Sequence, residues 1–389
     1  MRLKPVRRIA KLGARVAERD FGRDLKRAAL LGGLGMAVAG VGLGVGVGLT
    51  GWALWRRFGM RPEELRGRVV LITGGSRGLG FAIAQEVARL GARIVICARD
   101  ERELQIAREQ LQRGGSEVLA ITCDVTNRDD VLQMVNEANA HFGRIDVLIN
   151  NAGVIQVGPI QSQTIVDFQE AMDVMFWGVV YPTLAVLPQM IARREGRIAN
   201  ITSFGGKVAV PHLAPYGAAK FAAVGFSEAM RAELARDNVK VTTVVPGLMR
   251  TGSHLNAHFK GNNSAEFTWF AFGAATPGIS MNARRAARKI VNAIRRGRAE
   301  IILTPQAKLA VMFHGLFPGL TSDVLGIINR GLPSVPMGTG QDRHTGRESE
   351  NAITRSMLTE FGRRAAREFN QFAEQSGGTV PLTRGDVAI

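Results

Sequence analysis

Tyr216 and Lys220 stand four residues apart in the stretch Tyr-Gly-Ala-Ala-Lys, a spacing that places both side chains on one face of a helix. An ammonium group beside a phenol stabilises the phenolate and lowers the pKa of the tyrosine. Such a pair can donate and accept a proton during catalysis. Because the same spacing is common on solvated helix faces, the rest of the chain must supply a site in front of the pair.

A glycine-rich turn follows the first predicted strand of the folded part of the chain. The strand covers residues 69–72, the turn 73–80, and a helix is predicted through Leu90. Strand, turn and helix in this order bind a dinucleotide, because glycines let backbone N–H groups and the helix N-terminus approach the diphosphate. The cofactor residues expected in this turn are Thr73, Gly74, Ser76, Arg77, Gly78, Leu79 and Gly80.

The end of the second predicted strand, residues 93–98, indicates which cofactor is bound. An NAD site usually has an acidic residue there to hold the ribose hydroxyls. This chain has Arg99, and Arg77 adds a second cation from the glycine-rich turn. The two cations favour the 2′-phosphate of NADP(H), although Asp100 and Glu101 follow directly and keep NAD(H) open.

Predicted strands alternate with helices along the following chain. Further strands are expected at 118–122, 145–149, 196–201, 239–245 and 299–303. The alternation predicts an α/β fold, a Rossmann-like doubly wound parallel sheet of about seven strands with helices on both faces. Ligands of such sheets bind beyond the carboxyl ends of the strands, where Asp124, residues 150–153 and Ser203 are expected.

Taken together, these residues resemble the short-chain dehydrogenase/reductase family over about residues 67–305. The motifs, in the family's order, are Thr-Gly-x-x-x-Gly-x-Gly at 73–80, Asn-Asn-Ala-Gly at 150–153, Ser203, Tyr216-x-x-x-Lys220, and Pro246-Gly247 with Thr251. The resemblance implies hydride transfer between a nicotinamide cofactor and an alcohol or carbonyl. It implies Tyr216 as acid/base, Ser203 as hydrogen-bond donor to the substrate oxygen, and Lys220 as the residue that lowers the tyrosine pKa and holds the nicotinamide ribose.

The resemblance also implies cofactor contacts from the other strand ends. Asp124 would meet the adenine, Asn151 would border the cofactor channel, and Pro246 would flank the nicotinamide. The full set of expected cofactor residues outside the turn is Arg99, Asp124, Val125, Asn151, Ala152, Gly153, Tyr216, Lys220, Pro246, Gly247 and Thr251. No metal-ligand spacing is visible, and Cys97 and Cys123 lie in apolar runs that predict core packing in a reducing compartment.

Met175 departs from the family's pattern. It stands where the family commonly has an asparagine that organises a water chain for proton relay. A methionine side chain cannot hold such a water. A catalytically weak or inactive NADP(H)-binding membrane scaffold is therefore the alternative to an enzyme.

The N-terminal part of the chain predicts membrane association. Of the net charge of +17, residues 1–68 contribute fifteen Lys and Arg against five Asp and Glu. Residues 1–27 are predicted to form a basic amphipathic segment, with a basic tail as the alternative. Residues 28–55 are uncharged and glycine-rich and are long enough to cross the roughly 30 Å hydrocarbon core. Residues 56–66 form a linker before the domain at 67–305.

The C-terminal part predicts a substrate end and two appendages. A long irregular stretch from Thr251 to about Pro277 would form a lid, and its aromatic side chains favour an apolar substrate. Residues 306–332 are an apolar extension, read as a packed or membrane-dipping helical hairpin, and 333–389 form a polar tail with a helix at about 353–372. The aromatic residues of the predicted lid are Phe259, Phe267, Trp269, Phe270 and Phe272.

The sequence thus predicts a membrane-associated oxidoreductase that moves a hydride between NADP(H) and a hydrophobic, lipid-, steroid- or retinoid-like carbonyl or alcohol. The expected partners are this small molecule, membrane lipid and a second copy of the chain, bound through the catalytic domain or the glycine-rich helix. No nucleic-acid recognition motif is visible. The catalytic domain is expected to face the cytoplasm, where reduced nicotinamide is abundant, although the positive-inside rule weakly places the N-terminus there as well.

Overall fold

The computed structural model describes residues 62–276, 280–334, 340–351, 354 and 360–371. All of them belong to a compact unit that begins at Pro62. The basic segment predicted at 1–27 and the membrane segment predicted at 28–55 lie outside the described residues.

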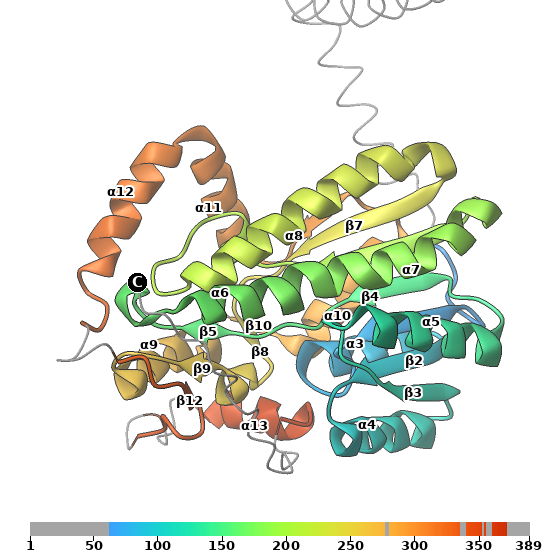
Figure 1. The fold of residues 1–389 in the computed structure, drawn as a ribbon, viewed down its shortest axis with the longest axis horizontal. Coiled ribbons are helices and arrows are strands. Elements are labelled where there is room, and N and C mark those ends of the chain that lie inside the picture. The colour runs from blue at the N-terminus through green and yellow to red at the C-terminus, as the bar shows by residue number, and fades with distance from the viewer. Residues whose placement is uncertain (1–61, 277–279, 335–339, 352–353, 355–359, 372–389) are drawn as a thin grey trace, which may run out of the picture. The chain divides into compact units, whose positions relative to one another are not determined.

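A seven-stranded sheet forms the centre of this unit (Figure 1), with strand order β11-β7-β6-β4-β1-β2-β3. Every neighbouring pair in it is parallel. The predicted doubly wound parallel sheet is therefore confirmed. The strands are β1 (Val69–Thr73), β2 (Arg93–Ala98), β3 (Val118–Thr122), β4 (Val147–Asn150), β6 (Gly196–Ile201), β7 (Val239–Val245) and β11 (Glu300–Ile302).

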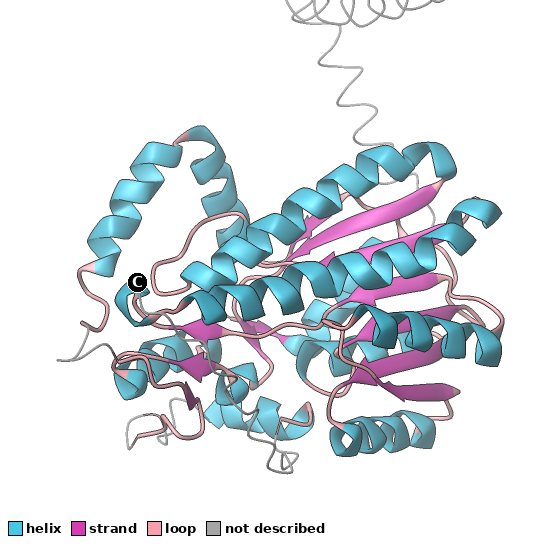
Figure 2. Ribbon diagram, in the orientation of Figure 1, coloured by secondary structure: helices cyan, strands magenta, loops and turns pink. Residues whose placement is uncertain are grey.

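Helices cover both faces of the sheet, as Figure 2 shows. Two separate clusters of buried apolar side chains, one on each face, form the core. Because β1 is buried at every position, its sequence reads as a continuous apolar run rather than an alternating one. One face carries α3 (Gly78–Arg89), α4 (Glu101–Arg113) and α10 (Ala283–Arg295), and the other carries α5 (Arg128–Phe142), α7 (Gly178–Arg193) and α8 (Ala214–Glu233).

The strand order reverses at β1, which pairs with β2 on one side and with β4 on the other. The loops after β1 and β4 therefore leave the sheet in opposite directions and open a crevice beyond the carboxyl ends of the strands. This crevice is where the sequence places the glycine-rich turn and the Asn-Asn-Ala-Gly motif.

Among the described residues, one helical run, Ile165–Arg193, is long and apolar enough to cross a membrane. It consists of α6 (Ile165–Met172), the π-helical segment η2 (Asp173–Trp177) and α7. Because α7 packs against β4 and β6 and buries Val186 and Met190 completely, the apolar composition of the run is explained by the core of the sheet.

The stretch after Thr251 is not irregular, and this part of the prediction is wrong. Residues Asn263–Ala275 form helix α9, in which the Asn262 side chain accepts a hydrogen bond from the Ala265 amide as the N-cap. The helix buries Phe267, Phe270, Ala271 and Ala274, the spacing of one helix face. The apolar face of α9 packs against β9. This packing stabilises a helix in the stretch that the sequence predicts to be a loop.

Short elements complete the substrate side. β8 (Met249–Arg250) pairs with β10 (Met281–Asn282), and β9 (His258–Phe259) pairs with β5 (Gln156–Val157) and β12 (His344–Thr345). The short helical turns are η1 (Ile160–Ser162), η3 (Phe204–Gly206), η4 (Leu234–Asp237) and η5 (Ser253–Asn256).

The described residues of the C-terminal part form the helices α11, α12 and α13. α11 (Pro305–Leu316) and α12 (Pro318–Asn329) form a hairpin, and α13 (Glu360–Glu368) packs against α9 and β8. The hairpin shows large apolar side chains to solvent, with Leu309 at 67% and Leu316 at 72% exposure. Of the two interpretations of this apolar stretch, close packing against the domain does not fit these exposures.

Candidate active site

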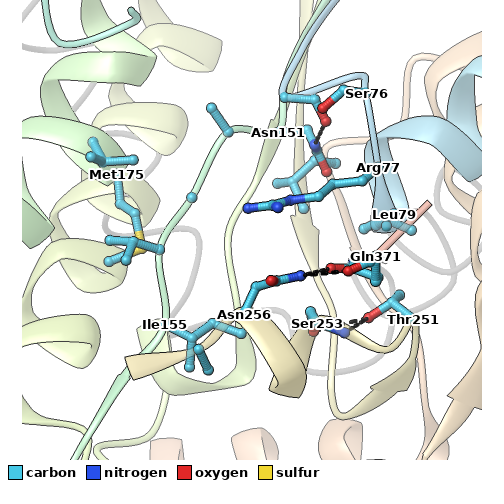
Figure 3. Close-up of a pocket in the computed structure, with 18 of the residues that line it drawn as sticks. Ser76, Arg77, Leu79, Asn151, Ile155, Met175, Thr251, Ser253, Asn256 and Gln371 are labelled. Carbon is cyan, nitrogen blue, oxygen red and sulfur yellow. Dashed lines mark hydrogen bonds between the residues drawn. The ribbon is translucent and has the colours of Figure 1, made fainter. Parts of the chain in front are cut away.

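A cavity of about 1910 Å³ lies at the carboxyl ends of the strands. It is lined by every catalytic or cofactor residue expected from the sequence except Thr73 and Gly80. Figure 3 shows part of its wall, with Arg77, Gln371 and Thr251 on one side and Met175 and Ile155 on the other. Residues from six strand ends, those of β1, β2, β3, β4, β6 and β7, therefore converge on one cavity.

Thr73 and Gly80 support the glycine-rich turn without lining the cavity. The Thr73 hydroxyl accepts hydrogen bonds from the backbone amides of Asn151 at 2.9 Å and Ala152 at 3.2 Å. A Cβ atom at Gly80 would lie 2.0 Å from the carbonyl oxygen of Gly74, so only glycine allows α3 to start this close to the turn. Both residues fix the wall of the cavity without lining it.

The turn leaves room for a nicotinamide dinucleotide. Gly74 has φ of +63° and Gly78 has φ of +60°, conformations that favour glycine. A Cβ atom at Gly74 would lie 2.9 Å from Cα of Ala152 and would narrow the cavity at the start of α3. No side chain caps this helix, but its Gly78 amide donates to the carbonyl oxygen of Phe369. The N–H groups of the first turn that follow Gly78 are the ones left for a diphosphate.

The residues expected to transfer the proton meet between β6, η3 and α8. Ser203, two residues after the end of β6, accepts the amide of Gly205 at 3.1 Å and lies near enough to Tyr216 to oppose the rise in the pKa of its phenol. Lys220 donates from Nζ to the carbonyl oxygen of Ile201 at 2.9 Å. Both Tyr216 and Lys220 line the cavity, so the predicted spacing on one helix face is realised on α8.

The expected lowering of the Tyr216 pKa by Lys220 is not found. Burial raises the pKa of Tyr216, and the hydrogen bond with Ser203 opposes this rise. Burial also lowers the pKa of Lys220 to about 8, because the ammonium form is the charged one. The lysine is 5% exposed, and its amine faces the carbonyl of Ile201 rather than the phenol.

Met175 fills the position of the usual relay asparagine with an apolar side chain. It lies in the π-helical segment η2, is completely buried, and packs in a cluster with Ala171, Ala219 and the ring of Tyr216. A Cβ atom at Gly153 would lie 3.8 Å from both Met175 Cγ and Lys220 Nζ, which places the methionine in the surroundings of the lysine. Met175 thus belongs to the same buried region as the lysine.

The end of the cavity at β2 and β3, where the adenine is expected, contains a buried carboxylate that the sequence reasoning missed. Glu103, in the first turn of α4, accepts from Arg77 at 2.7 Å and from Ser76 at 3.3 Å. Asp100 caps the same helix by accepting the Glu103 amide at 2.8 Å. An acidic residue three positions after a helix cap was the only sequence signal for Glu103. Arg99 lines the cavity and makes no hydrogen bond or ion pair with another described residue.

The strand-end residues Asp124 and Asn151 are held by backbone groups. Asp124 accepts from the amide and the hydroxyl of Thr126, both at 2.9 Å. Asn151 donates to the carbonyl oxygens of Thr73 and Gly74. These bonds present both residues to the cavity in fixed orientations.

The other end of the cavity is mainly apolar. Val154, Ile155, Val210, Leu213, Trp269 and Phe270 line it. Trp269 is oriented by a hydrogen bond from Nε1 to Glu266 at 2.7 Å, and Glu266 also pairs with His212. Of the predicted lid aromatics, Phe259 and Phe267 are core residues, whereas Trp269 and Phe270 reach the cavity.

Fold and site together define an α/β oxidoreductase with a nicotinamide cofactor, and comparisons with known proteins identify its family. A family model described as short chain dehydrogenase matches residues 68–259. An Anopheles gambiae protein named dehydrogenase/reductase SDR family protein 7-like is 36% identical over 253 residues, 64% of this chain and 78% of that protein. An Arabidopsis thaliana protein named 11-beta-hydroxysteroid dehydrogenase-like 2 is 33% identical over 268 residues, 68% of this chain and 83% of the relative.

Two solved structures have the same fold. The actinorhodin polyketide ketoreductase structure with NADPH superimposes with a TM-score of 0.56 at 28% identity, covering 62% of this chain and 97% of the ketoreductase. A Burkholderia phymatum short chain dehydrogenase/reductase in complex with NAD gives a TM-score of 0.61 at 24% identity, with 71% and 99% coverage. The chain belongs to the short-chain dehydrogenase/reductase family and is an oxidoreductase of CH–OH and C=O groups.

Proposed function

We propose that the protein is a membrane-associated, NADP(H)-dependent oxidoreductase of hydrophobic carbonyls or alcohols, with Tyr216 as acid/base. The observation that carries the proposal is that Ser203, Tyr216 and Lys220 line the same cavity as the glycine-rich turn. The bound nicotinamide supplies or takes up the hydride. In the direction of reduction, the Tyr216 hydroxyl gives its proton to the carbonyl oxygen as the carbonyl carbon gains the hydride, and the C=O double bond becomes C–OH.

Ser203 and Lys220 support this proton transfer. Because the Ser203 oxygen accepts the amide of Gly205, its hydroxyl hydrogen is left to donate, to the phenol or to the substrate oxygen on which negative charge grows. After the transfer Tyr216 is a phenolate, whose charge a protonated Lys220 stabilises. With a pKa of about 8, Lys220 is mostly protonated at neutral pH. Because this pKa lies only slightly above neutral pH, the lysine can also release its proton.

Three observations at the adenine end support NADP(H) over NAD(H). Asp100 is occupied as a helix cap, and Glu103 is buried and paired with Arg77. Both carboxylates are thus already engaged within the protein. The guanidinium of Arg99 is exposed at the end of β2 and available to a 2′-phosphate.

The apolar end of the cavity supports a hydrophobic substrate. Its aromatic and aliphatic lining surrounds few polar groups, the pattern of a site for a lipid- or steroid-sized molecule. The name of the Arabidopsis relative, 11-beta-hydroxysteroid dehydrogenase-like 2, is in line with a steroid-like substrate.

Membrane association is supported by two parts of the chain. Residues 28–55 carry no charged side chain, and the α11–α12 hairpin exposes Phe313, Phe317, Leu320 and Ile327, among others. Exposed apolar side chains at this density mark a surface that binds lipid or protein. We assign the domain to the cytoplasmic side because reduced nicotinamide is found there.

The lipid part of the proposal is tested by flotation with anionic vesicles, using protein that starts at Pro62. Leu316→Glu and Ile327→Glu should reduce vesicle binding about tenfold. The matched control Leu132→Glu changes an exposed leucine on α5 and should leave binding unchanged. Equal vesicle binding by all variants contradicts a lipid-binding hairpin.

The catalytic proposal is tested with the purified full chain, NADPH or NADH, and a panel of apolar ketones and aldehydes. NADPH oxidation with at least one steroid- or lipid-like carbonyl is expected, with little oxidation of NADH. Binding of NADPH without turnover across the panel would instead favour the scaffold function that the buried Met175 suggests.

A further inference from the structure

The described C-terminal residues 360–371 return to the cofactor end of the domain. Helix α13 is anchored by Ala366, which is fully buried against Gly252, and by an ion pair between Glu368 and Arg284. Phe369 follows and is also completely buried, in the core cluster that contains α3 and α10. The segment is therefore a packed part of the domain, although it lies beyond the residues matched by the family model.

The end of this segment is bound to the glycine-rich turn. The Gly78 amide donates to the carbonyl oxygen of Phe369 at 2.8 Å, and the Asn370 side chain donates to the carbonyl oxygen of Ser76 at 3.3 Å. Asn370 has φ of +57°, a left-handed conformation that asparagine tolerates better than most residues. It also accepts from Gln110 at 3.1 Å. The chain is thus turned so that the next residue points into the cavity.

Gln371 connects the two walls of the cavity. Its Oε1 atom accepts from Asn256 Nδ2 at 2.6 Å, and its backbone carbonyl accepts from Asn256 and Arg347. Figure 3 shows Gln371 and Asn256 meeting end to end between Arg77 and Thr251. Gln371 is 2% exposed and lines the cavity, so two packed neighbours fix its orientation.

The Nε2 atom of Gln371 is a donor without a described partner at the N-terminus of α3. It lies 2.8 Å from the position that a Cβ atom of Gly78 would take. No hydrogen bond among the described residues uses this Nε2 atom, although the Oε1 atom of the same amide is bonded. A nearly buried amide donor beside a helix N-terminus provides the kind of group that binds a phosphate oxygen.

We infer that Gln371 is a cofactor-binding residue that donates from Nε2 to the diphosphate of the nicotinamide cofactor, and that residues 369–371 form the outer wall of its cleft. The inference rests on the proposed cofactor site. The Gly78 amide donates to the carbonyl oxygen of Phe369 and is therefore not free for the diphosphate. The side-chain amide of Gln371 lies at the same place and offers a donor instead. Since both cofactors carry the diphosphate, the contact is independent of the NADP(H) preference.

The test measures cofactor binding directly, by fluorescence titration of the full chain with NADPH and with NADH. Gln371→Ala should raise the Kd about tenfold, the effect of losing a hydrogen bond to a charged group. Gln371→Glu should raise it further, since a carboxylate would face the diphosphate. The matched control is Gln112→Ala, which changes an exposed glutamine of the neighbouring helix α4 and should leave the Kd unchanged.

Either of two results for Gln371→Ala overturns the inference. A Kd for Gln371→Ala within twofold of the wild type, in protein with unchanged melting temperature, excludes the contact. Tighter binding by Gln371→Ala would show that the segment obstructs the cofactor. If Gln371→Ala melts at a lower temperature, Gln371→Asn keeps the amide but shortens the side chain, and this variant must still weaken cofactor binding.

A wild-type protein that binds neither cofactor refutes the proposed function and the inference together. If the wild type binds cofactor and the Gln371 variants bind it equally well, the inference alone is refuted.

Discussion

The Nζ atom of Lys220 lies 6.0 Å from the ring centroid of Tyr216, and its hydrogen bond is made with the carbonyl of Ile201 instead. Ser203 is the polar side chain that lowers the pKa of the phenol. In this arrangement burial dominates the acidity of both α8 residues, raising one pKa and lowering the other. The site therefore favours the acid form of the tyrosine, which is the form that the proposed reduction requires.

Replacing Tyr216 by phenylalanine should remove the proton donor and keep the ring. We expect kcat with NADPH and an apolar carbonyl to fall about 10³-fold, within the usual range for general acid catalysis. The matched control is Tyr181→Phe, which changes the other tyrosine of the chain. Tyr181 lies in α7 and its ring stacks on that of Trp177. Cofactor titration checks that the Tyr216→Phe protein still binds NADPH. Residual activity near wild type would assign proton transfer to another group.

Met175→Asn should place a polar amide beside Lys220. The amide, or a water that it holds, can hydrogen-bond the ammonium, so the pKa of Lys220 should rise above about 8. We expect kcat to increase several-fold and the free energy of unfolding to fall by about 1–3 kcal/mol, because a polar group replaces a buried apolar one. The readouts are the pH profile of kcat and urea denaturation.

The control for this change is Met175→Leu, which keeps the site apolar at similar volume. It should preserve both the pH profile and kcat. If the asparagine and leucine variants shift the profile equally, repacking of the Ala171 and Ala219 cluster explains the effect and the relay does not.

The central sheet was predictable because its signals are local. A strand buried on both faces, such as β1, is a short apolar run, and the alternation with helices determines that the strands are parallel. Parallel strands end at one edge, so Asp124, Asn151 and Ser203 could be placed together from their positions after strands alone. The residues of the glycine-rich turn and of the Tyr-x-x-x-Lys pair could also be predicted because each motif is a local pattern in the sequence.

The missed residues depend on contacts between distant parts of the chain. Gln371 reaches the glycine-rich turn from the far end of the sequence, and no local pattern around it indicates a ligand. The pKa of Tyr216 was predicted from the helix spacing, which gives the shared face but neither the burial nor the direction of the Lys220 amine. For α9, the Asn262 cap and the repeated apolar positions were present in the sequence but were read as a loop.

Arg99→Ala should weaken the binding of NADPH and leave the binding of NADH nearly unchanged. Losing the guanidinium would remove a charge-assisted contact with the 2′-phosphate, so the Kd for NADPH should rise about tenfold or more while that for NADH changes less than threefold. Arg113→Ala is the control, because Arg113 lies on α4 as an exposed residue paired with Glu109. Equal losses for both cofactors would show that Arg99 serves the fold or the adenine and does not select NADP(H).

The stability of the domain should depend on pH through His254. Burial lowers the pKa of this histidine to about 4, and its ring packs against Phe267 beneath Gly362 of α13. Between about pH 6.5 and pH 4 the unfolded chain therefore binds a proton at this position and the folded chain does not, so stability rises with pH across this window and is lost as the pH falls. The difference of about 2.5 pH units corresponds to about 3 kcal/mol.

Urea denaturation at several pH values isolates this contribution when wild type is compared with His254→Phe, which keeps a planar apolar ring. The wild type should lose about 3 kcal/mol relative to the variant between pH 6.5 and pH 4. His141→Gln changes an exposed histidine of α5 and should leave the wild-type curve unchanged. Parallel curves for wild type and His254→Phe would show that His254 is not held neutral. Because His254 supports α13, cofactor affinity should weaken over the same pH window if the Gln371 contact exists.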